Sequence, residues 1–280
     1  MEEPRTNAYA PPVDQLLTYG ENRGFKPEDW PDYLALGIGP EHIPDLIRMA
    51  IDEELEWADE DSLEVWAPIH AWRTLGQLRA EAAIEPLFSL FTGLEESDWV
   101  TEELPEVFGM IGPAALPTLK AALADIATDE WVCISAIGCV EKIGVCWPEA
   151  RSACVAFLME QLELFTVNDP EVNGFLVSSL VDLEAAEAAS LIEWAFAARC
   201  VDRTVMGDWE DVQVELGLKS AEEVKQRQVK KYSETPFPST VHASTTSGVS
   251  SKSKHEHEAS HKKAKGKMAK QSRKKNRKRS

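Results

Sequence analysis

The sequence lacks several patterns that define large classes of protein. No run of about twenty apolar residues occurs among its 280 residues, so no transmembrane helix is predicted. The first twelve residues contain Glu2, Glu3 and Pro4 and no apolar stretch, which argues against a secretory signal. We therefore expect a cytoplasmic protein without a membrane partner.

Residues arranged for catalysis or metal binding are also scarce. The six histidines form no pattern with serine and aspartate that would activate a nucleophile, and no glycine-rich phosphate loop is present. The cysteines include no Cys-x-x-Cys pair of the kind used by zinc sites, which favours free thiols in a reducing compartment. We expect no cofactor, no metal site and no enzymatic activity. The five cysteines are Cys133, Cys139, Cys146, Cys154 and Cys200.

The net charge of −19 is the sum of two opposed parts. Residues 252–280 contain thirteen Lys or Arg and two Glu, a net charge of +11. The other 251 residues hold 16 basic and 46 acidic groups, a net charge of −30. Acidic runs such as Asp52-Glu53-Glu54 are interpreted as solvated faces of this acidic body.

Glycine and proline recur after an apolar residue along the body. Ile38-Gly39-Pro40 returns as Ile111-Gly112-Pro113, 73 residues later. Weaker copies begin at Leu78, Ile143 and Leu183, so that the five anchors are spaced by 40, 33, 32 and 40 residues. Periods of this size are typical of stacked helical hairpins.

Each repeat is predicted to contain a helix A, a short turn and a helix B. Apolar residues recur at three- and four-residue steps in both helices, as in helices that bury one face. Asp169-Pro170-Glu171 is a strong helix start, because it supplies a side-chain cap, a preset φ and a negative charge in the first turn. Helix A is predicted over residues 63–77, 98–110, 130–142 and 170–182, and helix B over 41–55, 81–91, 114–125, 149–164 and 185–198.

The predicted fold class is all-α, an α-solenoid similar to a HEAT or armadillo superhelix of about five helical hairpins. Residues 1–29 are predicted to be an irregular lead-in with one short helix at 13–19, and residues 30–218 to form the solenoid. Residues 219–231 are predicted to be a polar helix or linker that begins with a capping box at Ser220 and Glu223. Residues 232–280 are rich in Ser, Lys and His, and we expect a disordered basic tail.

The repeated unit resembles the HEAT-like repeats of phycobilin lyases. It reads Asp-x-x-Val, an alanine-rich helix, Ile-Gly and a second helix ending in Leu, and it covers about residues 38–198. The resemblance implies a role as a lyase or a chaperone of a chromophore protein. That family typically has Arg after the Val of helix A, whereas this chain has Thr101, Cys133 and Asn173. The layout is also similar to bacterial HEAT-repeat proteins with a C-terminal SEC-C zinc motif, although the cysteines of that motif are absent from residues 262–280.

The acidic body predicts a non-catalytic interaction scaffold or adaptor that binds a basic protein partner. The B helices are expected to line the concave face of the solenoid with mainly acidic side chains, which would speed the encounter with a basic partner. A tryptophan ladder spaced by 33 and 32 residues runs in step with the repeats, and it is open to two interpretations, packing between hairpins or anchoring of a partner. The predicted partner-binding residues are Trp66, Trp72, Trp99, Trp131, Glu41, Asp45, Glu81, Glu85, Glu149 and Glu187.

The basic tail has two further predicted roles. As an alternative function, its cations would neutralise phosphates without reading sequence, as in an RNA- or ribosome-associated factor. In a third hypothesis the tail folds back on the acidic body, where tethering raises its effective concentration. A cluster around His255, His257 and His261 lies in the same tail and lacks the surroundings that fix a metal site. The cations predicted to meet nucleic acid or an acidic surface are Lys262, Lys263, Lys265, Lys267, Lys270, Arg273, Lys274, Lys275, Arg277, Lys278 and Arg279.

Overall fold

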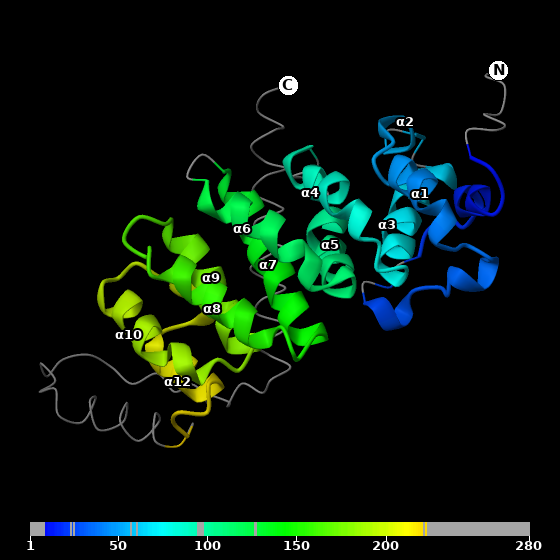
Figure 1. The fold of residues 1–280 in the computed structure, drawn as a ribbon. Coiled ribbons are helices and arrows are strands. Elements are labelled where there is room, and N and C mark those ends of the chain that lie inside the picture. Colours follow the sequence, from blue (N-terminus) through cyan, green and yellow to red (C-terminus); the bar gives the residue numbers. More distant parts are fainter. Residues whose placement is uncertain are drawn as a thin grey trace, which may run out of the picture. The chain divides into compact units, whose positions relative to one another are not determined.

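The structure, a computed structural model, consists of helices and the turns that join them (Figure 1), with no strand among the described residues. The prediction of an all-α chain is thereby confirmed. The chain divides into two compact units, residues 1–161 and residues 162–280, and each is described by itself. The described residues are 9–22, 24, 26–56, 58, 59, 61–93, 98–125, 128–220 and 222.

Short 3-10 helices (η) precede and punctuate the α-helices of the first unit. The 3-10 helices are η1 (Val13–Thr18), η2 (Pro27–Asp29), η3 (Leu34–Leu36), η4 (Pro40–His42), η5 (Glu64–Trp66), η6 (Glu81–Ala83) and η7 (Pro113–Ala115). The α-helices are α1 (Ile43–Ala50), α2 (Glu53–Glu56), α3 (Ala67–Gln77), α4 (Ile84–Gly93), α5 (Asp98–Ile111), α6 (Leu116–Ala124), α7 (Glu130–Cys146) and α8 (Arg151–Leu162), whose last residue begins the second unit.

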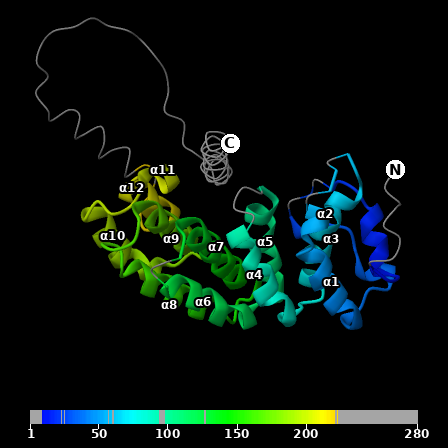
Figure 2. The same ribbon diagram turned by 90° about the horizontal axis from the view of Figure 1, so that it is seen from above.

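The helices of the first unit lie in two rows. Figure 2 shows α1, α4 and α6 along one side and α3, α5 and α7 along the other. In the second row α3 packs against α5 and α5 against α7, and between the rows α1 packs against α3, α4 against α5 and α6 against α7. Successive helix pairs therefore cover each other's apolar sides.

The second unit contains α9 (Pro170–Asp182), η8 (Ala186–Ala188), α10 (Ala189–Ala197), α11 (Arg203–Met206) and α12 (Trp209–Glu215). Helix α9 packs against α11, and α10 packs against α12. Asn173, one of the residues that departs from the phycobilin-lyase pattern, is fully buried on α9. Its Nδ2 donates to the carbonyls of Phe165 (2.9 Å) and Cys200 (2.8 Å). This side chain therefore fastens the segments on both sides of α9.

Several predicted helix bounds agree with the structure, whereas the helices predicted from residues 63 and 185 begin at Ala67 (α3) and Ala189 (α10). Helix α9 spans the predicted residues 170–182, and α5 begins at the predicted residue 98. The Asp169 carboxylate accepts the backbone N–H of Glu171 at 2.8 Å, which confirms the predicted cap. The helix predicted at 41–55 is instead interrupted, because α1 ends at Ala50 and α2 starts at Glu53.

One predicted helix end is wrong. The repeat pattern ends helix A before Ile143-Gly144, whereas α7 continues to Cys146 with both of those residues buried inside it. The chain leaves the helix at Trp147, whose φ is −127° and ψ is 86°. Pro148 follows, and proline disfavours the α conformation of the residue before it. A glycine within an apolar helix therefore does not by itself predict where the helix ends. It does so only where the backbone at the turn requires a positive φ.

Three helices end in the same hydrogen-bonded turn. After α3, Arg79 adopts φ 50° and the backbone N–H of Ala80 donates to the carbonyl of Leu75 at 3.0 Å. This is the Schellman motif, in which a left-handed residue closes the helix. Glu184 after α9 (φ 53°) and Arg199 after α10 (φ 62°) take the same place. Residues other than glycine therefore occupy the left-handed position after all three helices.

The turn after α5 requires glycine for two reasons. Gly112 has φ 95°, a region that L side chains rarely adopt. A Cβ at this position would also lie 2.5 Å from Cε2 of Trp147. The indole of Trp147 is held there because its Nε1 donates to the Gly109 carbonyl at 2.8 Å and the Arg79 guanidinium lies 4.7 Å from the ring. The indole of Trp147 therefore occupies the space that a side chain at position 112 would need.

The N-terminal lead-in is part of the core of the first unit. The sequence predicts an irregular segment there, and the described part contains η1 and η2. Tyr9, Val13 and Leu16 are buried, as are Trp30 and Tyr33 just after the lead-in, and η1 packs against α3. These side chains are too few and too irregularly spaced to show a helical period, which is why the sequence pattern does not reveal their burial.

Two other predictions concern the C-terminal residues and membrane-spanning helices. The polar helix predicted over 219–231 and the basic tail predicted over 232–280 lie outside the described residues, apart from Lys219, Ser220 and Glu222. No single described helix has the length and apolar composition needed to span a membrane, while the bent pair Trp99–Ile111 with Pro113–Ala124 passes on length and composition alone.

Candidate functional site

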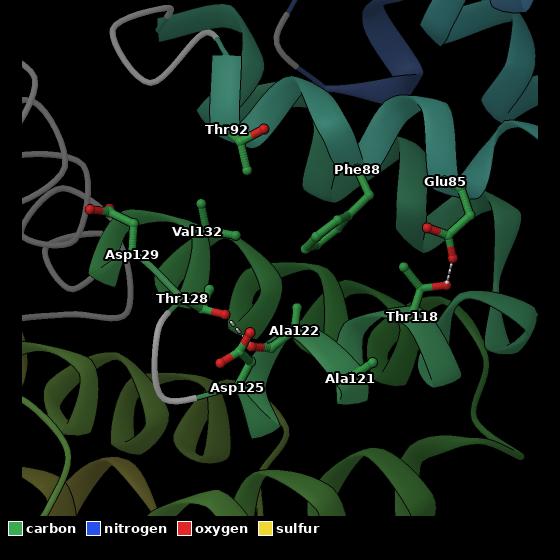
Figure 3. Close-up of a pocket in the computed structure, with 10 residues that line it drawn as sticks. All are labelled: Glu85, Phe88, Thr92, Thr118, Ala121, Ala122, Asp125, Thr128, Asp129 and Val132. Carbon is green, nitrogen blue, oxygen red and sulfur yellow. Dashed lines mark hydrogen bonds between the residues drawn. The ribbon is translucent and has the colours of Figure 1, made fainter.

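A groove lies between α4, α6 and the start of α7, with a volume of about 460 Å³ (Figure 3). Its size falls in the range of pockets that hold ligands. The lining residues come from one B helix, from the next B helix and from the A helix that follows. They are Glu85, Phe88 and Thr92 on α4, Thr118, Ala121, Ala122 and Asp125 on α6 and after it, and Thr128, Asp129 and Val132 at the start of α7.

Hydrogen bonds fix the walls of the groove. The Thr118 hydroxyl donates to Oε1 of Glu85 at 2.6 Å and so joins α6 to α4. At the other end the Thr128 hydroxyl donates to the Ala122 carbonyl at 2.8 Å. Asp129 caps α7, because its Oδ1 accepts the backbone N–H of Trp131 at 2.8 Å. The groove is therefore held by contacts within the protein, as a pre-formed binding surface requires.

Phe88 supplies the aromatic surface of the groove. Its ring is half-buried and projects between α4 and α6 in Figure 3. The ring packs edge-on against Phe91 at 5.7 Å between centroids, and Phe91 in turn lies 6.1 Å from Phe108. Because Phe91 and Phe108 are fully buried, the Phe88 ring rests on the rigid core of the unit.

The groove carries negative charge only. Glu85, Asp125 and Asp129 line it, and no Lys, Arg or His is among its lining residues. The nearby cation of α6, Lys120, contacts α8, where its Nζ lies 3.3 Å from Glu160 and 5.3 Å from the centre of the Phe157 ring. A cationic ligand in the groove would thus lie near three carboxylates and the face of an aromatic ring.

The structure distributes the predicted acidic residues widely. Glu85 is the one that lines the groove, and Asp125 and Asp129 are lining residues that sequence reasoning did not single out. Asp45 is engaged by Arg48 on its own helix at 2.7 Å. The remaining predicted carboxylates are exposed but are not among the groove residues, and they are Glu41, Glu81, Glu149 and Glu187.

The tryptophans predicted as partner anchors are partly or fully covered by the protein. Trp66 and Trp99 are half-buried and form a T-shaped pair with centroids 5.4 Å apart. Trp72 is buried, with 1% of its surface exposed, so its ring is covered by the protein itself. Trp131 is half-buried at the start of α7.

A buried ion pair lies at the centre of these rings. Arg73 on α3 and Glu103 on α5 are both fully buried, and Nε of Arg73 donates to Oε2 of Glu103 at 2.7 Å. The Arg73 guanidinium also donates to the carbonyl of Gly24 (3.0 Å) and lies 5.2 Å from the ring of Trp30 and 5.9 Å from that of Trp99. The pair thus joins the lead-in to α3 and α5.

His70 extends this buried network toward the lead-in. Its Nε2 lies 2.8 Å from the Gly20 carbonyl, which can only accept, so Nε2 carries the proton and donates. Nδ1 then accepts the hydroxyl proton of Tyr33 at 2.7 Å. Burial lowers the pKa of His70 from 6.5 to about 4, against the opposing effect of the Gly20 carbonyl, and burial raises the pKa of Tyr33 to about 12. Both side chains are therefore neutral structural groups.

Possible metal ligands and thiols are also present in the described part of the chain. Among those residues no group of three or more His, Cys, Asp or Glu is placed to hold a metal ion. The cysteines are free, Cys139 and Cys154 being buried and Cys146 exposed. The cluster at His255, His257 and His261 lies outside the described residues.

The described residues define an all-α protein with an acidic, aromatic-lined groove between α4, α6 and the start of α7. Comparisons with protein-family models, with curated proteins and with solved structures find no match that would assign the chain to a family. The function is therefore argued from the groove itself.

Proposed function

We propose that the chain is a HEAT-like helical-repeat scaffold that binds a Lys- or Arg-rich segment of a protein partner in the groove between α4 and α6. The observation that carries this proposal is the combination of three carboxylates with the supported ring of Phe88 in one groove. The proposal extends the sequence-based hypothesis of an acidic surface for a basic partner, and it places that surface at named residues.

The repeated helix pairs support the scaffold part of the proposal. Pairs recur at the spacing of the sequence anchors, with A helices packed on A helices and the B helices α4 and α6 joined by the Glu85–Thr118 hydrogen bond. The same Schellman turn follows α3 and α9. In a solenoid each unit covers the apolar face of its neighbour, and the polar faces of consecutive helices form a continuous binding surface.

The chemistry of the groove favours a cationic peptide chain. A guanidinium or ammonium group is stabilised by the carboxylates, and it gains further from the face of an aromatic ring such as Phe88. The long apolar stems of Lys and Arg fit against Phe88, Ala121 and Val132 while their charged ends reach the rim. Electrostatic attraction of this kind raises the rate of association and makes it sensitive to salt.

The test uses a fluorescein-labelled ten-residue peptide of alternating Arg and Ala, with binding followed by fluorescence anisotropy. The receptor is the full chain with its eleven Lys and Arg between residues 262 and 279 replaced by Gln, here called the neutral-tail chain, so that the tail does not compete. The groove variant adds Glu85→Gln, Asp125→Asn and Asp129→Asn. These changes keep the acceptor for Thr118 and a good helix cap at position 129.

We expect the groove variant to bind the peptide at least about tenfold more weakly, since each lost charge-assisted contact contributes roughly 1.5 kcal/mol or more. A matched control variant removes three exposed carboxylates elsewhere, with Glu28→Gln, Glu53→Gln and Glu215→Gln, and should bind like the parent. Equal weakening in both variants would show that only the overall charge matters. Tighter binding of an RNA oligomer to the unmodified chain than of the peptide would favour the RNA-associated alternative.

A further inference from the structure

We infer that the chain carries its own competitor for this groove. The basic segment of residues 262–279 is proposed to occupy the α4–α6 groove of the same molecule, so that a partner binds only after displacing it. This inference rests on the proposed function, because it assigns a regulator to the same site. It is argued from charge, from the composition of the segment and from the length of chain that joins it to the body.

Charge complementarity is the first argument. The segment contains eleven Lys and Arg and no Asp or Glu, and the groove is lined by three carboxylates and no cation. The rest of the chain before residue 252 has a net charge of −30, so the surroundings also attract the segment. A tethered segment is present at an effective concentration of roughly a millimolar, which a free partner must exceed.

The composition of the segment fits the shape of the groove. Between its cations the segment carries mostly small side chains, Ala264, Gly266 and Ala269, which allow close approach of the backbone. Met268 is its single large apolar residue and stands between Lys267 and Lys270. A methionine thioether packs favourably on an aromatic ring. We therefore place Met268 against Phe88, with the two flanking lysines at the carboxylates of the groove.

A long connection joins the basic segment to the described residues. Thirty-nine residues lie between Glu222, the last described residue, and Lys262. A connection of this length spans up to about 130 Å when fully extended, and a flexible chain of the same length has a root-mean-square end-to-end distance of about 35 Å. The connection therefore does not confine the segment to the neighbourhood of Glu222.

The decisive experiment adds the labelled peptide of residues 262–280 to full-length protein that has been freed of nucleic acid by nuclease and high salt. The neutral-tail chain should bind this peptide, and the unmodified chain should bind it about ten- to thirtyfold more weakly, because its own segment fills the groove. The groove variant in the neutral-tail background should lose binding. The control variant in that background should bind like the neutral-tail chain.

A second measurement locates the contact within one molecule. Carbodiimide treatment of the unmodified chain should join Lys267 or Lys270 to Asp125, Asp129 or Glu85, and mass spectrometry should find these links in the monomer. A mixture of ¹⁵N-labelled and unlabelled chains should give no mixed links. The substitution Met268→Gln should restore part of the access of the labelled peptide to the groove.

The outcomes separate the two proposals. If the neutral-tail chain and the unmodified chain bind the peptide equally, the segment does not occupy the groove in cis, and the proposed function stands on the Arg-Ala peptide alone. If the neutral-tail chain binds neither peptide, the proposed function itself is wrong. Mixed isotope links would show that the segment reaches the groove of a second copy and would overturn the inference for a single chain.

Discussion

The buried imidazole of His70 predicts how the stability of the protein depends on pH. The imidazole is 1% exposed and neutral, with Nε2 donating to Gly20 and Nδ1 accepting from Tyr33. A second proton on Nδ1 would remove the acceptor that the Tyr33 hydroxyl uses, and it would put a cation near Arg73, which also lowers the pKa of His70. The folded protein therefore resists a proton that the unfolded chain takes up readily.

The size of the effect follows from the two pKa values of His70. The pKa is about 6.5 in the unfolded chain and about 4 in the folded protein. Between these values the unfolded chain binds more protons, so the free energy of unfolding decreases as the pH falls. From about pH 8 to about pH 5.5 this one group should remove about 1.4 kcal/mol, and the loss continues down to about pH 4.

Urea denaturation followed by tryptophan fluorescence would measure this loss. Work above about pH 5.5 avoids precipitation near the isoelectric point of 4.8. The variant His70→Gln can still donate to Gly20 but cannot titrate, so its stability should depend less on pH by about 1.4 kcal/mol over the same range, whatever its absolute stability.

Equal pH dependence in wild type and His70→Gln would refute the reasoning. It would mean that the imidazole is accessible enough to be protonated without unfolding. An NMR titration of the His70 ring at constant temperature gives an independent check, because the ring should remain neutral at about pH 5.5.

Other substitutions test the buried pair and the repeat turns. The variant Glu103→Gln should destabilise the fold by about 3–5 kcal/mol in urea denaturation, because Arg73 then stays buried without a counter-charge; a loss below about 1 kcal/mol would mean that water reaches the pair. The variant Gly112→Ala should cost at least about 2 kcal/mol and lower the melting temperature, since φ is 95° and the added Cβ meets Trp147. The variant Glu184→Gly should stabilise the protein by about 0.5–1 kcal/mol by relieving the left-handed conformation; a destabilised variant would show that the side chain contributes more than the turn costs.

The helices could be predicted from the sequence because their signals are local. An aspartate cap followed by proline fixes a helix start within a few residues, and α9 begins as Asp169 and Pro170 predict. The end of α7 could not be read in this way, because Ile143-Gly144 resembles a turn signal but stays in the helix until Trp147 and Pro148. Whether a glycine ends a helix depends on the packing around it.

Only some of the groove residues could be predicted from the sequence. Glu85 stood out as an exposed acidic residue of a B helix, but Asp125 and Asp129 join it only because α4, α6 and the start of α7 meet. Phe88 gave no sequence signal of its own, since an aromatic residue in an apolar helix is usually a core residue. Arg73 is the only Lys, Arg, Asp or Glu of α3, which is a signal of buried pairing, whereas Glu103 shares α5 with Asp98, Glu102 and Glu106 and could not be distinguished from them by sequence.

The sequence by itself determined the helical character and the opposition between an acidic body and a basic end. These depend on hydrophobic periodicity, capping and charge, which are properties of short segments or of the whole composition. The tertiary structure decided which residues share a site. The lead-in enters the core at Leu16, Arg73 pairs with Glu103, and three carboxylates meet beside Phe88, because contacts between distant segments follow from packing that no local pattern records.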